Sequence, residues 1–276
     1  MIPTNSSGRE EQMNRAAAIE CFYNYTEHFN PDDPMIRHKI VHTLSVAGLS
    51  EKIAGSLGLD MEDVDFAWFL GLLHDIGRFE QVRRYGTFVD SQSVDHAEFG
   101  ADLLFRDGLF RFFPTDDLSP ERRQTAETAI RLHNKLSLPD NLDRETRCFS
   151  QILRDADKVD IFRVVAEIPF EERIGKSRGL LSEAEEASPE VLECVAGHRC
   201  VPRAARHTVL DGLIAHACMA FELVFAESRI LAREQGNLKK LLSGTDENGR
   251  PIWGATAAEQ LRAVEKEIET AWNMTL

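Results

Sequence analysis

Residues 69–78 read Phe-Leu-Gly-Leu-Leu-His-Asp-Ile-Gly-Arg, and this stretch is the most informative part of the chain. It places an adjacent histidine and aspartate, His74 and Asp75, at the end of an apolar run. An imidazole nitrogen and a carboxylate oxygen on one short piece of backbone suit a divalent metal. The doublet alone is a weak signal, so the histidines and carboxylates around it decide its interpretation.

Three further histidines and one further aspartate extend the doublet into an ordered set. In chain order, the candidate metal ligands are His42, His74, Asp75, His96, His133 and Asp157. A structural metal needs only about four ligands. Six ligands of these types are enough to hold two metal ions. A single buried histidine is more often a hydrogen-bonded core residue, so the prediction rests on the whole set.

The ordered set resembles the HD superfamily of metal-dependent phosphohydrolases. The strings that carry the resemblance are His42-Thr43, Gly71 to Arg78, Asp95-His96-Ala97, His133-Asn134-Lys135 and Arg154 to Lys158. The resemblance covers roughly residues 36–165 and identifies no substrate. It implies an all-helical fold with a metal site at the centre of the bundle and, most often, hydrolysis of a phosphate ester.

The resemblance also implies how the ligands are used. Two divalent ions, drawn from Mn, Fe, Ni, Co, Mg and Zn, are expected to share the Asp75 carboxylate. The other ligands then divide between the two ions: His42, His74 and Asp157 bind one, and His96 and His133 bind the other. A hydroxide that bridges the ions is the expected nucleophile for in-line attack on phosphorus. If His96 and His133 are not ligands, the site holds one metal and these histidines bind phosphate.

Two cationic residues beside the ligands are candidates for contact with the substrate. Arg78 follows Asp75 by three residues and can fork onto phosphate oxygens, while Lys158 offers a point charge. In the competing interpretation, Arg78 or Lys158 forms a structural ion pair with Glu80 or Asp160.

Neighbouring residues compete with the predicted ligands. Asp155 lies two residues from Asp157 and is expected to point to another side of a helix, whereas Asp160 lies one turn on and fits an outer position around the metal. His38 lies four residues before His42, so a His-x-x-x-His metal pair is an alternative. A substrate-facing, capping or plain surface histidine is the other interpretation of His38.

Two other groups of residues are predicted to be structural. The first looks superficially like a zinc site but lacks a fourth ligand: Cys194, His198 and Cys200. The second is rich in phenylalanine and is expected to form core rather than to stack on bases: Phe88, Phe99, Phe105, Phe110, Phe112 and Phe113.

Composition limits the partners and the location of the protein. Its 276 residues include 32 Lys and Arg against 46 Asp and Glu, a net charge of −14. This charge disfavours nucleic-acid polymers and anionic membranes but allows a small phosphorylated substrate, because bound metal reverses the field in a pocket. The five cysteines form no CxxC pair, which predicts a reducing cytoplasm. The sequence contains no run of about 18 apolar residues, so no membrane span is predicted.

Helix-period segments recur along the chain, which predicts an all-α protein. The predicted helices cover residues 12–29, 35–57, 64–75, 94–106, 121–132, 147–165, 207–234 and 256–272. Polar turns are expected at residues 86–93, 115–120 and 244–251. We expect an HD-type helical core at residues 1–170 and a helical C-terminal extension at 171–276. The extension is expected to cover the core or to build a homo-oligomer interface, and residues 171–205 are expected to form an excursion or lid.

The leading hypothesis is a cytoplasmic HD-domain hydrolase of a small phosphate ester, either a nucleotide or a related monoester or diester. The second hypothesis is a di-iron oxygenase that uses the same six ligands, because ligand type limits the choice of metal only loosely. The third is a non-catalytic regulatory module that keeps its metal for stability.

Overall fold

The computed structural model describes residues 13–116, 118–168, 185–246 and 248–274. Within these ranges the chain forms helices, turns and one isolated antiparallel bridge between Thr245 and Pro251, which confirms the all-α class. The chain divides into two compact units, the first ending at Arg131 and the second beginning at Leu132. The division into residues 1–170 and 171–276 stays a prediction.

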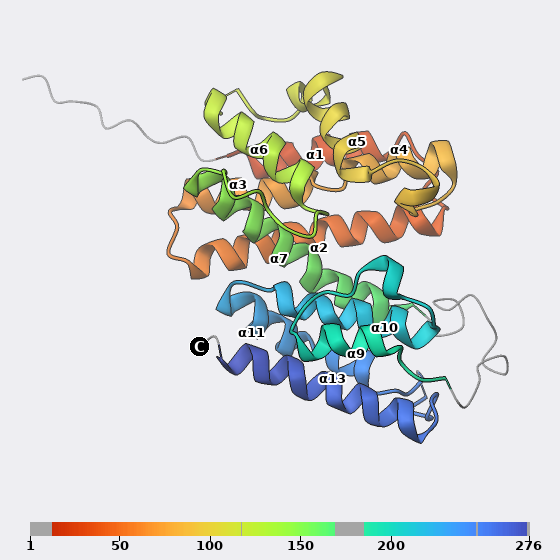
Figure 1. The fold of residues 1–276 in the computed structure, drawn as a ribbon. Coiled ribbons are helices and arrows are strands. Elements are labelled where there is room, and N and C mark those ends of the chain that lie inside the picture. Colours follow the sequence, from red (N-terminus) through yellow and green to blue (C-terminus); the bar gives the residue numbers. More distant parts are fainter. Residues whose placement is uncertain (1–12, 117, 169–184, 247, 275–276) are drawn as a thin grey trace, which may run out of the picture. The chain divides into compact units, whose positions relative to one another are not determined.

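The first unit contains His42, His74, Asp75 and His96. Its helices are drawn in red to yellow-green in Figure 1. Its elements are α1 (Arg15–Thr26), α2 (Pro34–Ser56), α3 (Met61–Leu73), α4 (Ile76–Tyr85), the short η1 (Asp90–Gln92), α5 (His96–Ala101), the π-helical turn η2 (Asp102–Arg106), η3 (Leu109–Phe112) and α6 (Pro120–Leu132), which reaches the unit boundary. The helices predicted at 35–57, 64–75 and 121–132 are therefore confirmed, with ends shifted by a few residues. His74, Asp75 and His133 lie in turns that directly follow α3 and α6, not inside these helices.

Local signals explain where α2 and α3 begin. Pro34 is the first residue of α2, and the Asp33 side chain accepts a hydrogen bond from the Met35 amide at 2.8 Å. The Asp60 side chain caps α3 in the same way by accepting a bond from the Asp63 amide at 2.9 Å. Helix α2 ends just before Gly58, whose φ of 71° lies in the left-handed region that favours glycine.

Helix α3 is buried on every side from Val64 to Leu73. A helix with so little polar surface is stable only inside a bundle, as the apolar run in the sequence predicted. Its last residue comes immediately before His74, so the His74-Asp75 doublet lies at the inner end of a core helix.

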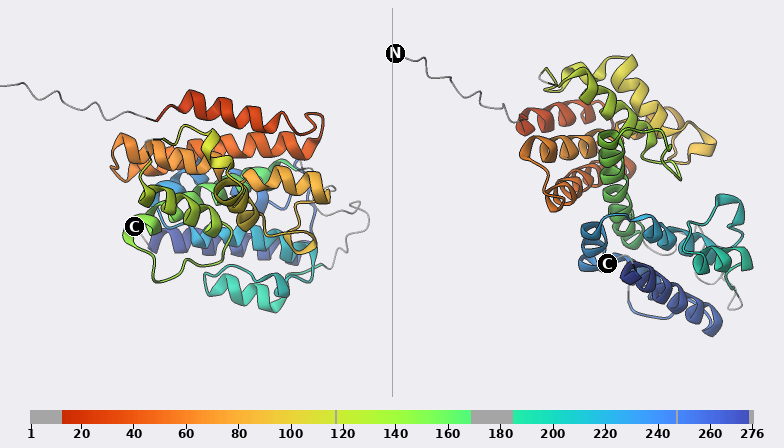
Figure 2. Two further views of the ribbon diagram at one scale, coloured as in Figure 1. Left: turned by 90° about the horizontal axis from the view of Figure 1, so that it is seen from above. Right: turned by 60° about the vertical axis from the view of Figure 1, so that its left-hand side comes forward.

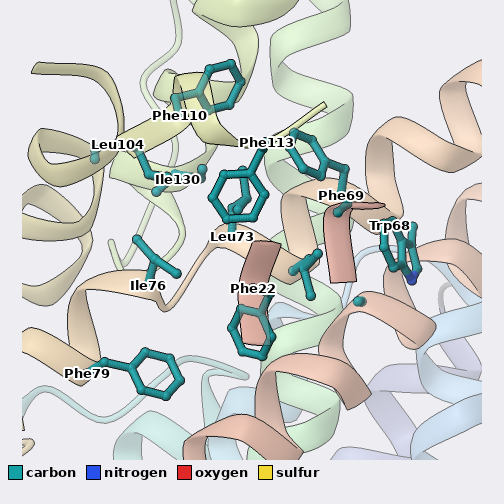
Figure 3. Packing of buried hydrophobic residues seen from close by; sticks show 14 of the residues in the cluster. Phe22, Trp68, Phe69, Leu73, Ile76, Phe79, Leu104, Phe110, Phe113 and Ile130 are labelled. Carbon is teal, nitrogen blue, oxygen red and sulfur yellow. The ribbon is translucent and has the colours of Figure 1, made fainter. Parts of the chain in front are cut away.

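A cluster of large apolar side chains supports this end of α3 (Figure 3). The Phe69 ring lies 5.9 Å from that of Phe113, and the Phe22 ring lies 5.9 Å from that of Phe79. Phe110 and Phe113 are buried, as expected for core residues, whereas Phe112 is 61% exposed. The aromatic core therefore fixes α1, α3 and α4 beside the doublet.

The second unit begins at Leu132 and contains the longest helix described. Its elements are α7 (Arg144–Glu167), α9 (Pro189–Ala196), η5 (Arg203–Ala205), α10 (Val209–Ala217), η6 (Cys218–Glu222), α11 (Ala226–Gln235), α12 (Asn237–Leu242) and α13 (Ala255–Met274). Helix α13, dark blue in Figure 2, is tied to α11 by the ion pair between Arg233 and Glu269 at 2.6 Å.

The prediction of one continuous helix over residues 207–234 is wrong. The chain forms α10 and α11 with a bend between them, because Asp155 from α7 accepts hydrogen bonds from the Val224 and Phe225 amides at 2.9 and 3.0 Å. Those two amides are thereby satisfied without a helical partner. A distant carboxylate therefore overrides the local helical pattern.

Other elements of the second unit agree in part with the prediction. Residues 244–246 and 248–251 agree with the expected turn, and Asp246 accepts bonds from the Asn248 and Arg250 amides. Part of the expected lid at 171–205 is the helix α9, while residues 169–184 lie outside the described ranges. None of the described helices combines the length and apolarity that a membrane crossing needs.

Candidate metal centre

Two glycines allow the ligand-bearing helices of the first unit to approach closely. A Cβ atom on Gly71 would lie 2.6 Å from Ala47 Cα, so α3 contacts the α2 backbone near His42. A Cβ atom on Gly77 would lie 2.6 Å from the backbone of both His96 and Gly100. These contacts bring α2, α3, α4 and α5 together around the doublet, and they explain why glycine stands at both positions.

Three predicted ligands form one buried group. The Nε2 atoms of His42 and His74 lie 3.3 Å apart, and each lies within 3.5 Å of Asp75 Oδ2. Two imidazole nitrogens at about 2.0–2.1 Å from one ion are themselves roughly 3.0–3.4 Å apart. The three residues are buried, and their side chains therefore have the spacing and chemistry of ligands to a single divalent ion.

His96 faces the other oxygen of the same carboxylate. Its Nε2 lies 3.5 Å from Asp75 Oδ1, whereas His42 and His74 face Oδ2. The two oxygens of Asp75 therefore point to different histidines. This arrangement suits a carboxylate shared between two ions.

Hydrogen bonds fix the orientation of two of the imidazoles. His74 Nδ1 lies 2.7 Å from the Gly71 carbonyl, and His96 Nδ1 lies 2.6 Å from Asp90 Oδ2. With Nδ1–H donating to these oxygens, the lone pair of each ring lies on Nε2 and faces Asp75. Such outer partners are typical of metal-binding histidines.

Asp90 is itself held by two residues of α4. Gln81, fully buried, donates to Asp90 Oδ1 at 2.9 Å and also to Ser93 and the Val94 carbonyl. Arg78 Nη1 donates to the same Asp90 oxygen at 2.8 Å. The loop before α5 is therefore fastened to α4 at the residue that orients His96.

The protonation states agree with a metal centre. Burial raises the pKa of the Asp75 carboxyl, but the Lys39 ammonium, His74, His42 and His96 together outweigh it and hold that pKa well below its usual range. Burial lowers the pKa of His96, although its bond to Asp90 opposes the change. Metal binding needs an ionised carboxylate and a neutral imidazole, and both pKa changes favour these forms.

His133 and Asp157 belong to the second unit. His133 follows α6 directly and is buried, and Asp157 lies half-buried on α7. Their role as ligands stays a prediction. Within this unit, buried Arg154 on α7 donates to the Leu132, Lys135 and Leu136 carbonyls, so it holds the segment that carries His133.

The acidic partners of Arg78 and Lys158 differ from those expected. Glu80 pairs with Arg83 and Arg84, and Asp160 pairs with Arg163. Arg78 instead pairs with Asp90, and Lys158 Nζ lies 3.1 Å from Glu222 Oε2. Arg78 Nη1 also donates to the Gln81 side chain and to the Phe88 carbonyl, so part of its guanidinium stabilises the loop before α5. Contact of either cation with substrate stays a prediction.

The competing carboxylates of α7 have structural partners. Asp155 accepts bonds from the 224 and 225 amides, and Asp160 accepts two bonds from Arg163 at 2.8 Å. Asp155 therefore has a structural role in the second unit, in agreement with the prediction that it points to another side of the helix. Two members of the zinc-like group also have structural partners. His198 lies 3.1 Å from Glu267, and Cys200 donates to the Cys218 carbonyl.

The sequence interpretation missed three residues of the centre. Lys39 lies 2.5 Å from Asp75 Oδ2, Asp90 orients His96, and Gln81 fastens Asp90. The spacing of Lys39, three residues before His42, was a signal that placed it on the same helical face. No local pattern marked Asp90 or Gln81, because their roles depend on how the loop folds back on α4.

The fold and the site define a helical protein with a buried histidine–aspartate centre suited to divalent metal. The sequence model of the HD domain family matches residues 40–161, a range that includes all six predicted ligands. Residues 40–161 are therefore similar to the HD domain, whose family binds divalent metals and consists mainly of hydrolases. No curated protein and no solved structure matches the chain.

Proposed function

We propose that the protein is a cytoplasmic, metal-dependent phosphohydrolase that cleaves a small phosphate ester, either a nucleotide or a related monoester or diester. The match of residues 40–161 to the HD domain supports the hydrolase class. The observation that carries the proposal is the position of Asp75, whose Oδ2 faces His42 and His74 while Oδ1 faces His96. A carboxylate in this position can serve two ions.

His133 and Asp157 complete the proposed centre. In this assignment Asp157 joins His42 and His74 on one side of Asp75, and His133 joins His96 on the other. The order of these residues and the extent of the family match support the assignment. Four ligands would serve a single structural ion, so two further ones favour a catalytic pair.

Bound divalent cations supply a water of lowered pKa and polarise the phosphoryl oxygens of the substrate. The chain's own residues position this chemistry. Asp90 and Gly71 fix the rings of His96 and His74, which keeps their Nε2 atoms directed at Asp75. The ligands of the first unit are almost fully buried, so little rearrangement is needed when an ion binds.

The charge of the chain supports the choice of substrate. A net charge of −14 disfavours nucleic-acid polymers and anionic membranes, whereas a small phosphate ester can reach a locally cationic pocket. Arg78 and Lys158 are proposed as further phosphate contacts, and the C-terminal helices are proposed as a homo-oligomer interface.

The test is purification without chelator, measurement of bound metals, and an anaerobic screen of phosphomonoesters, phosphodiesters and nucleotides with manganese, nickel or cobalt. We expect phosphate release by the wild type and by the control Asp107→Ala, whose side chain is exposed. We expect none from Asp75→Ala, which should also lose metal. Equal metal content and turnover in wild type and Asp75→Ala would contradict the site.

The same screen separates the alternatives. Iron content with oxygen-dependent turnover, and no anaerobic phosphate release, would replace the proposal with an oxygenase. Bound metal without turnover under either condition would indicate a regulatory module.

A further inference from the structure

Lys39 and Arg78 are the more exposed groups in contact with the shared carboxylate. The side chain of each is 14% exposed, whereas that of Asp75 is 3% exposed and that of His42 is 1% exposed. Lys39 Nζ lies 2.5 Å from Asp75 Oδ2, the oxygen that faces His42 and His74. Lys39 therefore reaches the centre from the side that is open to solvent.

An aromatic ring holds Lys39 at this edge. The Phe88 ring centroid lies 5.4 Å from Lys39 Nζ and 5.5 Å from Arg78 Cζ. An ammonium or guanidinium at such a distance from a ring face is attracted to it. Phe88 belongs to the loop that Arg78 fastens through the Phe88 carbonyl at 2.7 Å. The two cations and the ring thus form one fixed edge of the centre.

The edge would carry a net positive charge once divalent ions are bound. Lys39 and Arg78 both lie within 3.7 Å of Asp75, and Arg78 also pairs with Asp90. Divalent cations on Asp75 would compete with Lys39 for Oδ2 and would repel its ammonium. A phosphate group supplies several anionic oxygens, and lysine binds phosphate as a point charge.

We infer that Lys39 binds the phosphate group of the substrate at the solvent-facing edge of the metal centre. Phe88 positions the ammonium there. The inference rests on the proposed phosphohydrolase function and adds a substrate-binding residue to it.

The test uses the full-length, metal-loaded protein and inorganic phosphate as the probe, with binding measured by titration calorimetry and metal content measured in parallel. Lys39→Met keeps most of the side-chain length but removes the charge. We expect its phosphate affinity to fall about ten- to a hundredfold with metal content retained, because charge-assisted hydrogen bonds are worth this much. Lys39→Arg should keep most of the affinity.

Lys52→Met is the matched control, because Lys52 is an exposed lysine on the same helix. Its phosphate affinity should equal that of the wild type. Unchanged phosphate affinity in Lys39→Met would overturn the inference. Loss of metal from Lys39→Met and not from Lys39→Arg would also overturn it, because Lys39 would then act only by holding Asp75. Phosphate binding that depends on Lys39, in a protein that hydrolyses no ester, would overturn the proposed function and leave the binding site intact.

Discussion

His96 donates from Nδ1 to Asp90 Oδ2 across 2.6 Å, and the other nitrogen of the same ring faces the shared carboxylate. Burial raises the pKa of Asp90, but the bond from His96 and the charges of His96 and Arg78 outweigh burial and lower that pKa strongly. Asp90 is therefore ionised at neutral pH and is a permanent acceptor for the His96 ring. Through this contact the loop before α5 orients one of the proposed metal ligands.

Replacing Asp90 by asparagine tests that relationship. The amide keeps the size of the side chain but removes the charge that holds His96 Nδ1–H. We expect metal affinity to fall about ten- to a hundredfold, the usual cost of losing an outer partner of a histidine ligand. Competition with a metal-sensitive dye measures it. Asp107→Asn, at an exposed site of the same unit, should bind metal like the wild type.

His133→Ala tests the assignment of two ions. We expect this variant to lose one metal and keep the other, because His133 is proposed to serve only the His96 side of Asp75. The metal-to-protein ratio, measured by mass spectrometry after gel filtration, should fall by about half. An exposed histidine gives the control, His28→Ala, whose ratio should not change. A wild-type ratio in His133→Ala would exclude it as a required ligand.

Two glycine-to-alanine substitutions separate close packing from helix propensity. Gly77→Ala places a Cβ atom 2.6 Å from the backbone of His96 and Gly100, so we expect the free energy of unfolding to fall by about 1–3 kcal/mol. Gly48 lies inside α2, and a Cβ atom there would have nothing within 4 Å. Gly48→Ala should therefore raise the free energy of unfolding by about 0.5–1 kcal/mol. Urea unfolding measures both. Equal effects of the two substitutions would show that α4 and α5 are free to move apart.

Strong periodicity and strong end signals made part of this fold predictable. Helix α3 is apolar on nearly every side and could only be a core helix, and Asp33-Pro34 marks the start of α2. The bend after Glu222 was not predictable, because the acceptor for its amides, Asp155, lies about 70 residues away in the sequence. The local sequence pattern indicates a helix, but it cannot reveal a distant side chain that accepts hydrogen bonds from the backbone amides.

The centre divides in the same way. His42, His74, Asp75 and His96 were found from their order, and the structure brings these four together. The ring-orienting Asp90 was missed, since its neighbour Asp95 caps α5 and looks no different in sequence. Whether a carboxylate turns toward a histidine or toward a helix end depends on the path of the loop.

The last prediction concerns Arg154, which is 3% exposed and links α7 to the segment after α6. Its guanidinium donates to the carbonyls of Leu132, Lys135 and Leu136, and it also pairs with Glu222 at 3.3 Å. Arg154→Met removes these hydrogen bonds of a buried guanidinium and its pairing with Glu222, so we expect the free energy of unfolding to fall by about 3 kcal/mol.

Because the affected segment includes His133, the folded fraction of the variant should lose metal as His133→Ala does. Arg154→Lys should be intermediate, since one ammonium cannot reach all three carbonyls. Arg144→Met provides the control: Arg144 is exposed on the same helix, and its replacement should change stability by no more than about 0.5 kcal/mol. Wild-type stability and metal content in Arg154→Met would show that the turn after α6 holds its shape without this arginine.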